Sequence, residues 1–359
     1  MRTDRVLVVN AGSSSLKLRL LAGQEVVSGA DLAADGDPAA AVRDWPTPDV
    51  VGHRVVHGGT EFRGAVRVDA AVRAQLEELT DLAPLHQPKS LAALDAVTAV
   101  LPDVAAVACF DTAFHASIPE AAATYAVPNE WRQRWGIRRY GFHGLSHAWA
   151  ARRAAELTGR PLDELRLVSC HLGAGASVTA VLGGRSVDTT MGFTPLEGLV
   201  MATRSGSVDP GLVLWLLEHE HLSAHEVATA LEQRSGLLAL AGTPDLREVE
   251  IRSCSGDPRA VMALEVYLHR LVAGIAAMTA AAGGLDVLVF TGGVGEHSAT
   301  VRARAAAGLA FLGVAVEDQA NEHAEGDTDI SAGGATVRTV VVAAREDLQV
   351  AHEVRALLT

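Results

Sequence analysis

The fold is decided by residues 5–20, RVLVVNAGSSSLKLRL. Residues 5–10 form a short Val-rich run, which is typical of a buried strand. Small residues follow at 11–15, and leucines then alternate with Lys17 and Arg19, as in a half-buried strand. This pattern predicts a β-hairpin with a tip of small residues, not the strand–loop–helix arrangement of a P-loop.

A similar pattern opens the second half of the chain. Residues 167–170 are apolar, residues 171–177 (HLGAGAS) form a turn of small residues, and residues 178–182 are again strand-like. Two similar hairpins, each opening one half, indicate a duplicated architecture with a cleft between two lobes. The alternative is that both are ordinary hairpins, because Gly-rich turns between strands are common.

The remaining segments follow an α/β pattern. Strands are predicted at 105–110, 287–291 and 337–343, and helices at 69–82, 146–157, 258–282 and 347–358. Polar residues follow several of these strands, and active groups of open α/β sheets gather at the carboxyl ends of strands. Residues 33–44, rich in Ala and Asp, are predicted to be a surface loop.

Composition excludes several classes of function. The chain has 359 residues, of which 49% are hydrophobic and 20% charged, as expected for a globular protein of two lobes. A net charge of −13 disfavours nucleic acid as a partner. The most apolar stretch, residues 271–290, is interrupted by Asp286 and is predicted to be a buried helix and a strand, so no membrane partner is expected.

The cellular location is predicted from the N-terminus and the cysteines. The N-terminus reaches an apolar strand within five residues and has no signal-peptide pattern. The three cysteines are widely spaced and suit a reducing compartment. We therefore expect a cytoplasmic protein.

Several polar residues match the needs of phosphoryl transfer. This reaction requires cations around the transferring group, a metal on the donor phosphates and a positioned acceptor. Arg54 lies in GHRVVHGG (52–59) and Arg204 in MATRSGSVDP (201–210), and both have the small or apolar neighbours of an oxyanion site. Asp111 directly follows a predicted buried strand, where burial disfavours a carboxylate unless a cation or metal pairs with it.

Histidines and a second Gly-rich loop are further candidates. His143 and His147 lie in YGFHGLSH (140–147), four residues apart, so a metal pair is one interpretation, although no acidic third ligand accompanies them locally. The loop FTGGVGEH (290–297) follows a predicted strand, and such loops let the backbone approach a nucleotide closely. Its glycine spacing is not the dinucleotide-binding fingerprint.

In their order along the chain, these runs closely resemble the acetate kinase family, the acetokinases of the actin, sugar-kinase and Hsp70-like superfamily. The matching runs are VNAGSSSLK (9–17), GHRVVHGG (52–59), APLH (83–86), FDTAFH (110–115), YGFHG-x-SH (140–147), MGFTPLEGL (191–199) and the R-x-G-S-x-D-P pattern at 204–210. The resemblance implies an α/β, two-lobed, duplicated ribonuclease H-like (actin-like ATPase) fold with the active site in the interlobe cleft. The N-terminal lobe would comprise residues 1–113 with the returning C-terminal helix, 348–359, and the nucleotide-binding lobe residues 114–347.

The resemblance also implies an activity and site residues. The activity is reversible, Mg²⁺- or Mn²⁺-dependent phosphoryl transfer from ATP to acetate, giving acetyl phosphate and ADP, in a homodimer. Metal ligands would be Asn10 and Glu346, and catalytic residues Arg54, His86, Asp111, His143 and Arg204. The acceptor would contact Arg54, Val56, Leu85, Phe142 and Pro195. The nucleotide would contact Ser13, Ser15, Lys17, His171, Leu172, Gly173, Ala174, Gly175, Asp245, Leu246, Arg247, Gly293, Val294, Gly295, Glu296 and His297.

Three departures from the family pattern leave alternatives open. Ala174 and His297 stand where the family usually has Asn, and Arg345 replaces another polar residue. All three lie on the nucleotide and metal side, so a different donor, including pyrophosphate, remains an alternative. A second alternative is that the acceptor is propionate or butyrate. A third is that the chain is a catalytically weakened nucleotide-binding regulatory protein.

The role of Asp111 can be narrowed by the chemistry of the acceptor. In the family this position is the acid/base residue. Acetate is already ionised at pH 7 and needs no strong base. We therefore expect Asp111 to orient other groups more than to shuttle a proton.

Overall fold

A computed structural model describes residues 3–12, 15–33, 36–83 and 86–359, which form two compact units. The first unit comprises Met1–Ala116, Phe142–Trp149 and Arg345–Thr359, and the second comprises Ser117–Gly141 and Ala150–Ala344. The predicted lobes, 1–113 with 348–359 and 114–347, differ from this division chiefly at residues 142–149.

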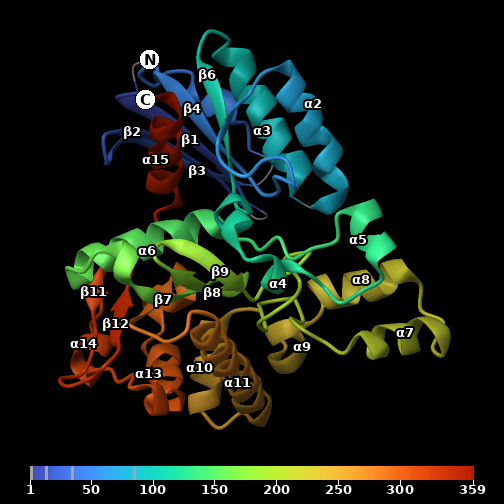
Figure 1. Ribbon diagram of the computed structural model, residues 1–359, viewed down its shortest axis with the longest axis vertical. Helices are drawn as coiled ribbons and strands as arrows, with labels where there is room; N and C mark the ends of the chain where they lie inside the picture. The colour runs from blue at the N-terminus through green and yellow to red at the C-terminus, as the bar shows by residue number, and fades with distance from the viewer. Residues whose placement is uncertain (1–2, 13–14, 34–35, 84–85) are drawn as a thin grey trace. The chain divides into compact units, whose positions relative to one another are not determined.

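The first unit is built on a six-stranded mixed sheet (blue to teal in Figure 1). Its strands are β1 (Arg5–Ala11), β2 (Ser15–Ala22), β3 (Glu25–Ala33), β4 (Val50–Val55), β5 (Val66–Arg67) and β6 (Ala105–Phe110), in the order β3-β2-β1-β4-β6-β5. β1, β2 and β3 form an antiparallel meander, β4 and β6 run parallel to β1, and β5 is an antiparallel edge strand. Val6, Leu7, Val8 and Val9 are all buried, as expected for a strand covered on both faces.

Helices cover both faces of this sheet. They are α1 (Pro38–Val42), α2 (Ala70–Glu78), α3 (Gln87–Val100) and α15 (Glu346–Leu358), with short 3₁₀ turns η1 (Leu79–Leu82) and η2 (Ala113–Ser117). Val350 and Val354 of α15 pack on one face, and Ala93 and Val97 of α3 pack on the other. A Cβ at Gly52 would lie 2.6 Å from Val350 and 2.9 Å from Val354, so only glycine lets the C-terminal helix approach β4 this closely.

The second unit repeats the same topology. Its strands are β7 (Arg166–Leu172), β8 (Ala176–Leu182), β9 (Arg185–Thr189), β10 (Val287–Thr291), β11 (Thr328–Asp329) and β12 (Arg338–Val341), in the order β11-β12-β10-β7-β8-β9. Again a three-stranded meander is followed by two parallel strands and a short antiparallel edge. Even the irregularity in the second strand recurs, between Leu20 and Leu21 and between Ala180 and Val181. The predicted duplication is confirmed.

The second unit has eleven helices within the described residues. They are α4 (Glu120–Ala123), α5 (Asn129–Trp135), α6 (Gly144–Thr158, which begins in the first unit), α7 (Pro210–Glu218), α8 (Ala224–Gln233), α9 (Gly236–Ala241), α10 (Leu246–Cys254), α11 (Pro258–Ala281), α12 (Gly292–His297), α13 (Ala299–Gly308) and α14 (Asp318–Glu322), with 3₁₀ turns η3 (Leu162–Glu164) and η4 (Ala310–Leu312). Some of them pack on this sheet, and others, such as α7 and α8, lie away from it. Of the described helices, α11 alone has the length and apolar composition to cross a bilayer. It packs on β7, β8 and β9 with Leu264, Leu271 and Ile275 buried, which fits the core helix of a globular unit.

Most predicted elements agree with the structure, but the surface loop predicted at 33–44 is wrong. Helix α1 lies within it. Asp37 caps this helix, because its carboxylate accepts hydrogen bonds from the N–H groups of Ala39 and Ala40 at 2.8 and 3.2 Å. Pro38 occupies the first helical position, where its missing N–H costs nothing.

Candidate active site

Polar residues of the first unit meet where three adjacent strands end. Arg54 lies at the end of β4, Asn10 lies opposite it on β1, and Asp111 follows β6. Arg54 donates from Nε to Asp111 Oδ1 at 3.1 Å and from Nη2 to Oδ2 at 2.6 Å. Its Nη1 also donates to Asn10 Oδ1 at 3.2 Å. The structure therefore brings together three residues that the sequence analysis selected separately.

Glu346 extends this cluster from the far end of the sequence. It is the first residue of α15, and its Oε2 accepts a hydrogen bond from Asn10 Nδ2 at 2.7 Å. Carboxylate and amide oxygens are ligands that Mg²⁺ prefers, usually one or two carboxylates completed by water and substrate phosphates. No group of three or more His, Cys, Asp or Glu side chains suited to a metal occurs among the described residues. Asn10 and Glu346 therefore fit a metal ion whose remaining ligands come from a nucleotide and water, and not one that is coordinated by protein side chains alone.

Burial and charge oppose each other in this cluster. The side chain of Asp111 is 2% exposed and that of Arg54 is 13% exposed. Burial raises the pKa of Asp111, and the guanidinium of Arg54 acts against that rise. Burial acts to lower the pKa of Arg54, but Asp111 and Glu346 bring it above its ordinary value. The bidentate geometry is that of a guanidinium with an ionised carboxylate.

His143 lies beside this cluster in the same unit. Its φ of +56° is a left-handed conformation that few non-glycine residues adopt, and it directly precedes α6. The next residue, Gly144, donates its N–H to the carbonyl of Asp111 at 2.9 Å, and a Cβ there would collide with that carbonyl. The sequence also suggested that His143 and His147 bind a metal together. Among the described residues, no third His, Cys, Asp or Glu lies with them to complete such a site.

Other predicted residues of this unit lie in varied surroundings. Val56 and Phe142 are buried, and the rings of Phe142 and His57 are 5.6 Å apart. His86 immediately precedes α3, and Lys17 is exposed opposite Asn10 in the β1–β2 register. Ser15 begins β2. The predicted residues Ser13 and Leu85 lie outside the described part of the chain.

Arg204 is the principal cation of the predicted set in the second unit. Its Nη1 donates to the carbonyl of Pro195 at 3.2 Å. No carboxylate of the described residues lies within ion-pair distance of its guanidinium. Burial lowers the pKa of Arg204, so the charged side chain is held in a place that disfavours charge. Such a site is completed when an anion binds.

The predicted nucleotide segments meet around the β7–β8 turn. Gly292 has a φ of +78°, and a Cβ there would lie 2.8 Å from the carbonyl oxygen of Leu172. The Gly-rich start of α12 therefore packs against residues 171–175. The segment that carries Arg204 contacts the same turn, because the N–H of Ala202 donates to the carbonyl of Ala174 at 3.1 Å.

The third predicted nucleotide segment is the start of α10. Asp245 caps this helix and pairs with Arg247, whose side chain is 84% exposed. Glu250 of α10 accepts a hydrogen bond from Ser298, which connects α10 with the end of α12.

Sequence reasoning missed residues that support these loops. Arg302 is 1% exposed and donates to the carbonyls of Gly295 and Glu296 at 3.0 and 2.7 Å, fixing the end of α12 from behind. The sequence places two arginines, Arg302 and Arg304, shortly after the Gly-rich loop, and nothing in it distinguished the buried one. Glu197 was visible within MGFTPLEGL, but nothing in the sequence identified its partners.

The three departures from the family pattern lie on or next to these segments. Ala174 is exposed in the β7–β8 turn, and His297 is the exposed last residue of α12. Arg345 precedes α15 and pairs with Asp347 through two bonds of 2.9 and 2.8 Å.

The predicted site residues are divided between the two units. Asn10, Arg54, Asp111, His143 and Glu346 belong to the first, and Arg204, Pro195 and the nucleotide loops belong to the second. That both sets act in one interlobe cleft stays a prediction.

Two copies of one mixed-sheet topology, with these groups at the strand ends, define a kinase of the duplicated actin-like ATPase fold. The sequence model of the Acetokinase family matches residues 41–352. An acetate kinase of Shouchella clausii is 42% identical over 97% of this chain and 98% of its own. The crystal structure of Porphyromonas gingivalis acetate kinase has a TM-score of 0.91 at 35% identity and covers 99% of this chain and 100% of its own. A propionate kinase of Francisella tularensis reaches 0.90 at 33% identity, covering 98% of both chains. The chain belongs to the acetokinase family, whose members are phosphotransferases with a carboxyl group as acceptor.

Proposed function

We propose that this protein reversibly transfers the γ-phosphoryl group of ATP to acetate, giving acetyl phosphate and ADP. The observation that carries the proposal is Arg204, a half-buried guanidinium with no carboxylate partner among the described residues. An anionic acceptor and the transferring phosphoryl group both supply the missing negative charge.

In the proposed reaction, a carboxylate oxygen of acetate attacks the γ-phosphorus. The bond between that phosphorus and the bridging oxygen breaks, and ADP carries away the electron pair. Arg204 balances charge on the equatorial oxygens. Arg54 does so as well, in the orientation that Asp111 fixes. No proton has to be removed from acetate at pH 7, which agrees with an orienting role for Asp111.

We propose Mg²⁺ as the metal, with Asn10 and Glu346 as its protein ligands. When bound, the ion would neutralise charge on the donor phosphates. The cluster places two acidic residues, Asp111 and Glu346, around the single guanidinium of Arg54, which suits a bound cation. ATP is the expected donor.

Propionate is the second acceptor to consider. The propionate kinase of Francisella tularensis is as similar in structure as the acetate kinase of Porphyromonas gingivalis. One methylene is discriminated by only about 1–3 kcal/mol in an apolar pocket. Fold and family therefore favour a short carboxylate, and the ratio of turnover on the two acids decides between them.

The test is steady-state turnover with ATP, Mg²⁺ and acetate, with acetyl phosphate trapped as a hydroxamate. We expect turnover that requires Mg²⁺ and falls about 100-fold or more in Arg204→Ala, as when a donor to transition-state charge is removed. Arg185→Ala, which removes an exposed Arg of β9, is the matched control and should keep wild-type activity. Folded wild-type protein that binds ATP but turns over no short carboxylate would instead support the regulatory alternative.

We also propose that the protein is a homodimer and is cytoplasmic. Helix α7 supports dimerisation, because its sequence PGLVLWLLE is almost wholly apolar and none of its residues is buried. The free thiols of Cys109, Cys170 and Cys254 suit a reducing compartment. Cell fractionation tests the location, and the dimer is tested through α7 in the Discussion.

A further inference from the structure

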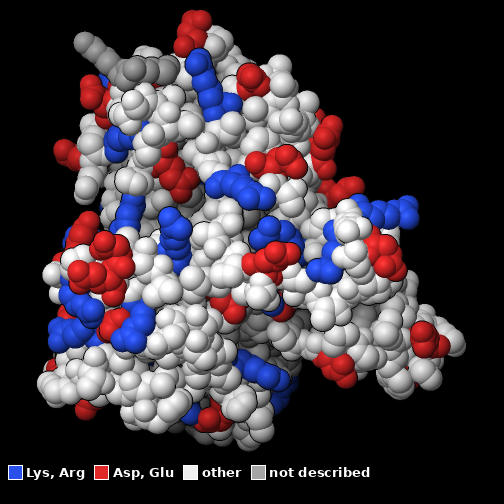
Figure 2. Space-filling view, viewed as in Figure 1, with Lys and Arg blue, Asp and Glu red and all other residues white. Residues whose placement is uncertain are grey.

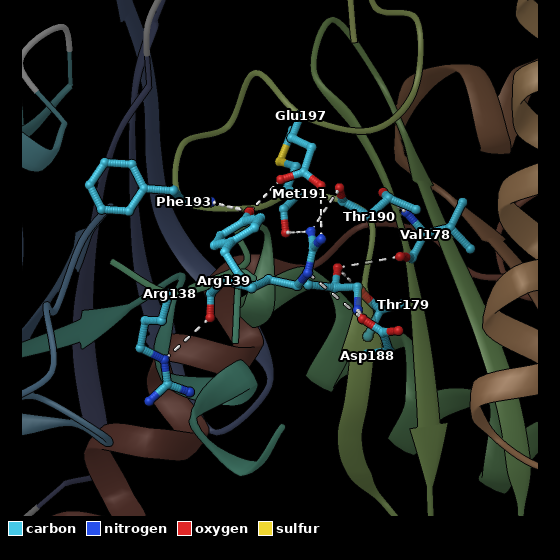
Figure 3. A network of polar contacts seen from close by, with 11 residues as sticks. Arg138, Arg139, Val178, Thr179, Asp188, Thr190, Met191, Phe193 and Glu197 are labelled. Carbon is cyan, nitrogen blue, oxygen red and sulfur yellow. Dashed lines mark hydrogen bonds and ion pairs between the residues drawn. The ribbon is translucent and has the colours of Figure 1, made fainter. Parts of the chain in front are cut away.

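The loop from Thr190 to Gly198 is closed by one arginine of another segment. Arg139 donates from Nη1 to the carbonyls of Thr190 and Met191 at 3.3 and 3.1 Å, at the start of the loop. Its Nη2 donates to Glu197 Oε1 at 2.8 Å, at the end of the loop. Figure 3 shows the guanidinium between these two ends. A single side chain therefore fixes both ends of a nine-residue segment.

Tyr125 holds the middle of the same loop. Its hydroxyl donates to Glu197 Oε2 and accepts a hydrogen bond from the N–H of Phe193 at 3.0 Å. The guanidinium carbon of Arg139 lies 5.4 Å from the centre of the Tyr125 ring, within the range of a cation–π contact. A Cβ at Gly192 would collide with both the Tyr125 hydroxyl and the Glu197 carboxylate, so only glycine permits this contact. We call Tyr125, Arg139 and Glu197 the loop clamp.

The charges of the clamp favour a fixed arrangement. Burial raises the pKa of Tyr125, and the hydrogen bond to Glu197 adds to that rise, so the hydroxyl stays protonated and donates. Asp188 of β9 lies 3.9 Å from Arg139 and supplies a second carboxylate. Hydrogen bonds to charged groups in half-buried sites are stronger than neutral ones, so the clamp resists movement of the loop.

The clamped loop leads directly to Arg204. Pro195 lies near the middle of the loop, and its carbonyl accepts the hydrogen bond from Arg204 Nη1. The loop is also anchored from the segment before it, because the N–H groups of Tyr140 and Gly141 donate to the carbonyl of Gly192 at 3.0 and 3.2 Å. Movement of the loop would therefore displace the Arg204 guanidinium and the ring of Pro195 together.

We propose that Tyr125, Arg139 and Glu197 are positioning residues that set the selectivity for short acyl groups, through the loop that carries Pro195 and supports Arg204. This role rests on the proposed function. A pocket excludes an extra methylene only if its wall does not yield, and a rigid wall discriminates about 10–200-fold. Loosening the clamp should weaken acetate binding and admit propionate, without a direct effect on the nucleotide loops.

The test compares Tyr125→Phe with the matched variant Tyr267→Phe. Each removes one hydroxyl, but Tyr267 lies in α11, and its hydroxyl has no hydrogen-bond partner among the described residues. In Tyr125→Phe we expect KM for acetate to rise at least threefold, the acetate-to-propionate ratio of kcat/KM to fall at least threefold, and KM for ATP to stay within twofold. Hydrogen exchange of a peptide spanning residues 190–198 should accelerate. Tyr267→Phe should change none of these. Glu197→Gln should show the same pattern as Tyr125→Phe, and it serves if Tyr125→Phe fails to fold.

The outcomes are separable. If the wild type uses acetate but Tyr125→Phe and Glu197→Gln keep its selectivity and acetate KM, the inference is wrong while the proposed function stands. An equal loss of kcat on both acids, with unchanged ratio, would reduce the clamp to general stability and also overturn it. A wild type without turnover on any carboxylate rejects the proposed function and the selectivity role together, whatever hydrogen exchange shows.

Discussion

Arg54 and Arg204 are both partly withdrawn from water, but their guanidinium groups have different partners. Arg54 is almost fully buried and has a bidentate carboxylate, so its charge is balanced before any substrate binds. Arg204 is half-buried and donates to a carbonyl, and no carboxylate of the described residues lies within ion-pair distance; Glu232 acts on it only from farther away. The charge of Arg204 is therefore less completely balanced than that of Arg54. This difference suits Arg54 to a permanent structural and electrostatic role and Arg204 to a role that changes as the anion binds.

At the residue scale, Asp111→Asn should retain at least tenfold more kcat/KM than Asp111→Ala. Asparagine keeps one oxygen that can accept from Arg54, whereas alanine leaves a buried cation without a partner. Breaking a buried pair in this way costs about 3–5 kcal/mol of stability, which urea unfolding would measure. The pH profile of Asp111→Asn should keep the wild-type shape, because no proton is transferred. Loss of the acidic limb of that profile would instead assign Asp111 as a general base, and loss of the basic limb would assign it as a general acid.

At the scale of elements, strand ends could be predicted and long-range partners could not. The segments 105–110 and 287–291 coincide with β6 and β10, because short apolar runs followed by polar or Gly-rich residues have few other structures. The site at Asp111 follows from that. By contrast, the residues of β3 are exposed or half-buried, so its sequence has no regular alternation of apolar residues from which a strand could be predicted. The loop clamp joins residues 125, 139 and 197, whose proximity depends on tertiary packing that no local pattern records.

One element-scale prediction concerns the entry of two parallel strands. Asp286 precedes β10 and accepts three hydrogen bonds of 2.9–3.0 Å from the backbone N–H and guanidinium of Arg166, the first residue of β7. The Arg166 side chain, with its backbone N–H, lowers the pKa of Asp286 to about 2. A carboxyl whose folded pKa lies below its unfolded value stabilises the fold above the unfolded pKa, and this contribution is lost as pH falls toward the folded one.

Asp286→Asn should therefore destabilise the protein by a constant amount above about pH 5, and by progressively less between about pH 4 and 2. Urea unfolding of the wild type and variant across this range measures the difference. Asp163→Asn, at an exposed position of η3, is the control and should show no such dependence. A difference that grows as pH falls would contradict the assignment of the pKa shift to the Arg166 contacts.

At the scale of the whole molecule, duplication has given the two units different chemistry on one topology. The strand ends β1, β4 and β6 carry an amide, a guanidinium and a carboxylate. The corresponding ends of β7 and β10 lead into Gly-rich turns, where backbone approaches backbone at Gly292 and Leu172. One unit therefore presents charged side chains at its strand ends, as the proposed metal ligands require, and the other presents backbone, as the proposed nucleotide loops require.

Helix α7 is an apolar helix that a single chain leaves at the surface. Asp209 caps it and Pro210 begins it, yet none of its residues is buried, and Leu212, Leu214 and Trp215 are each more than 40% exposed. Figure 2, viewed from the same side as Figure 1, shows few charged side chains over α7. Elsewhere on the displayed face, acidic and basic side chains are interspersed. A nine-residue helix is marginal in water unless its apolar face is packed, and contiguous apolar surface of this kind marks an interface.

We therefore expect wild-type protein to have twice the mass of one chain by size-exclusion chromatography with light scattering. Leu214→Glu should shift it to the monomer, because a carboxylate would be buried without a partner in the interface. Ile251→Glu is the matched control, since Ile251 is an exposed apolar residue of α10, outside α7, and its replacement should leave the dimer intact. If Leu214→Glu stays dimeric, the subunits associate through another surface. If both variants dissociate, the interface extends to α10, and α7 is only one part of it.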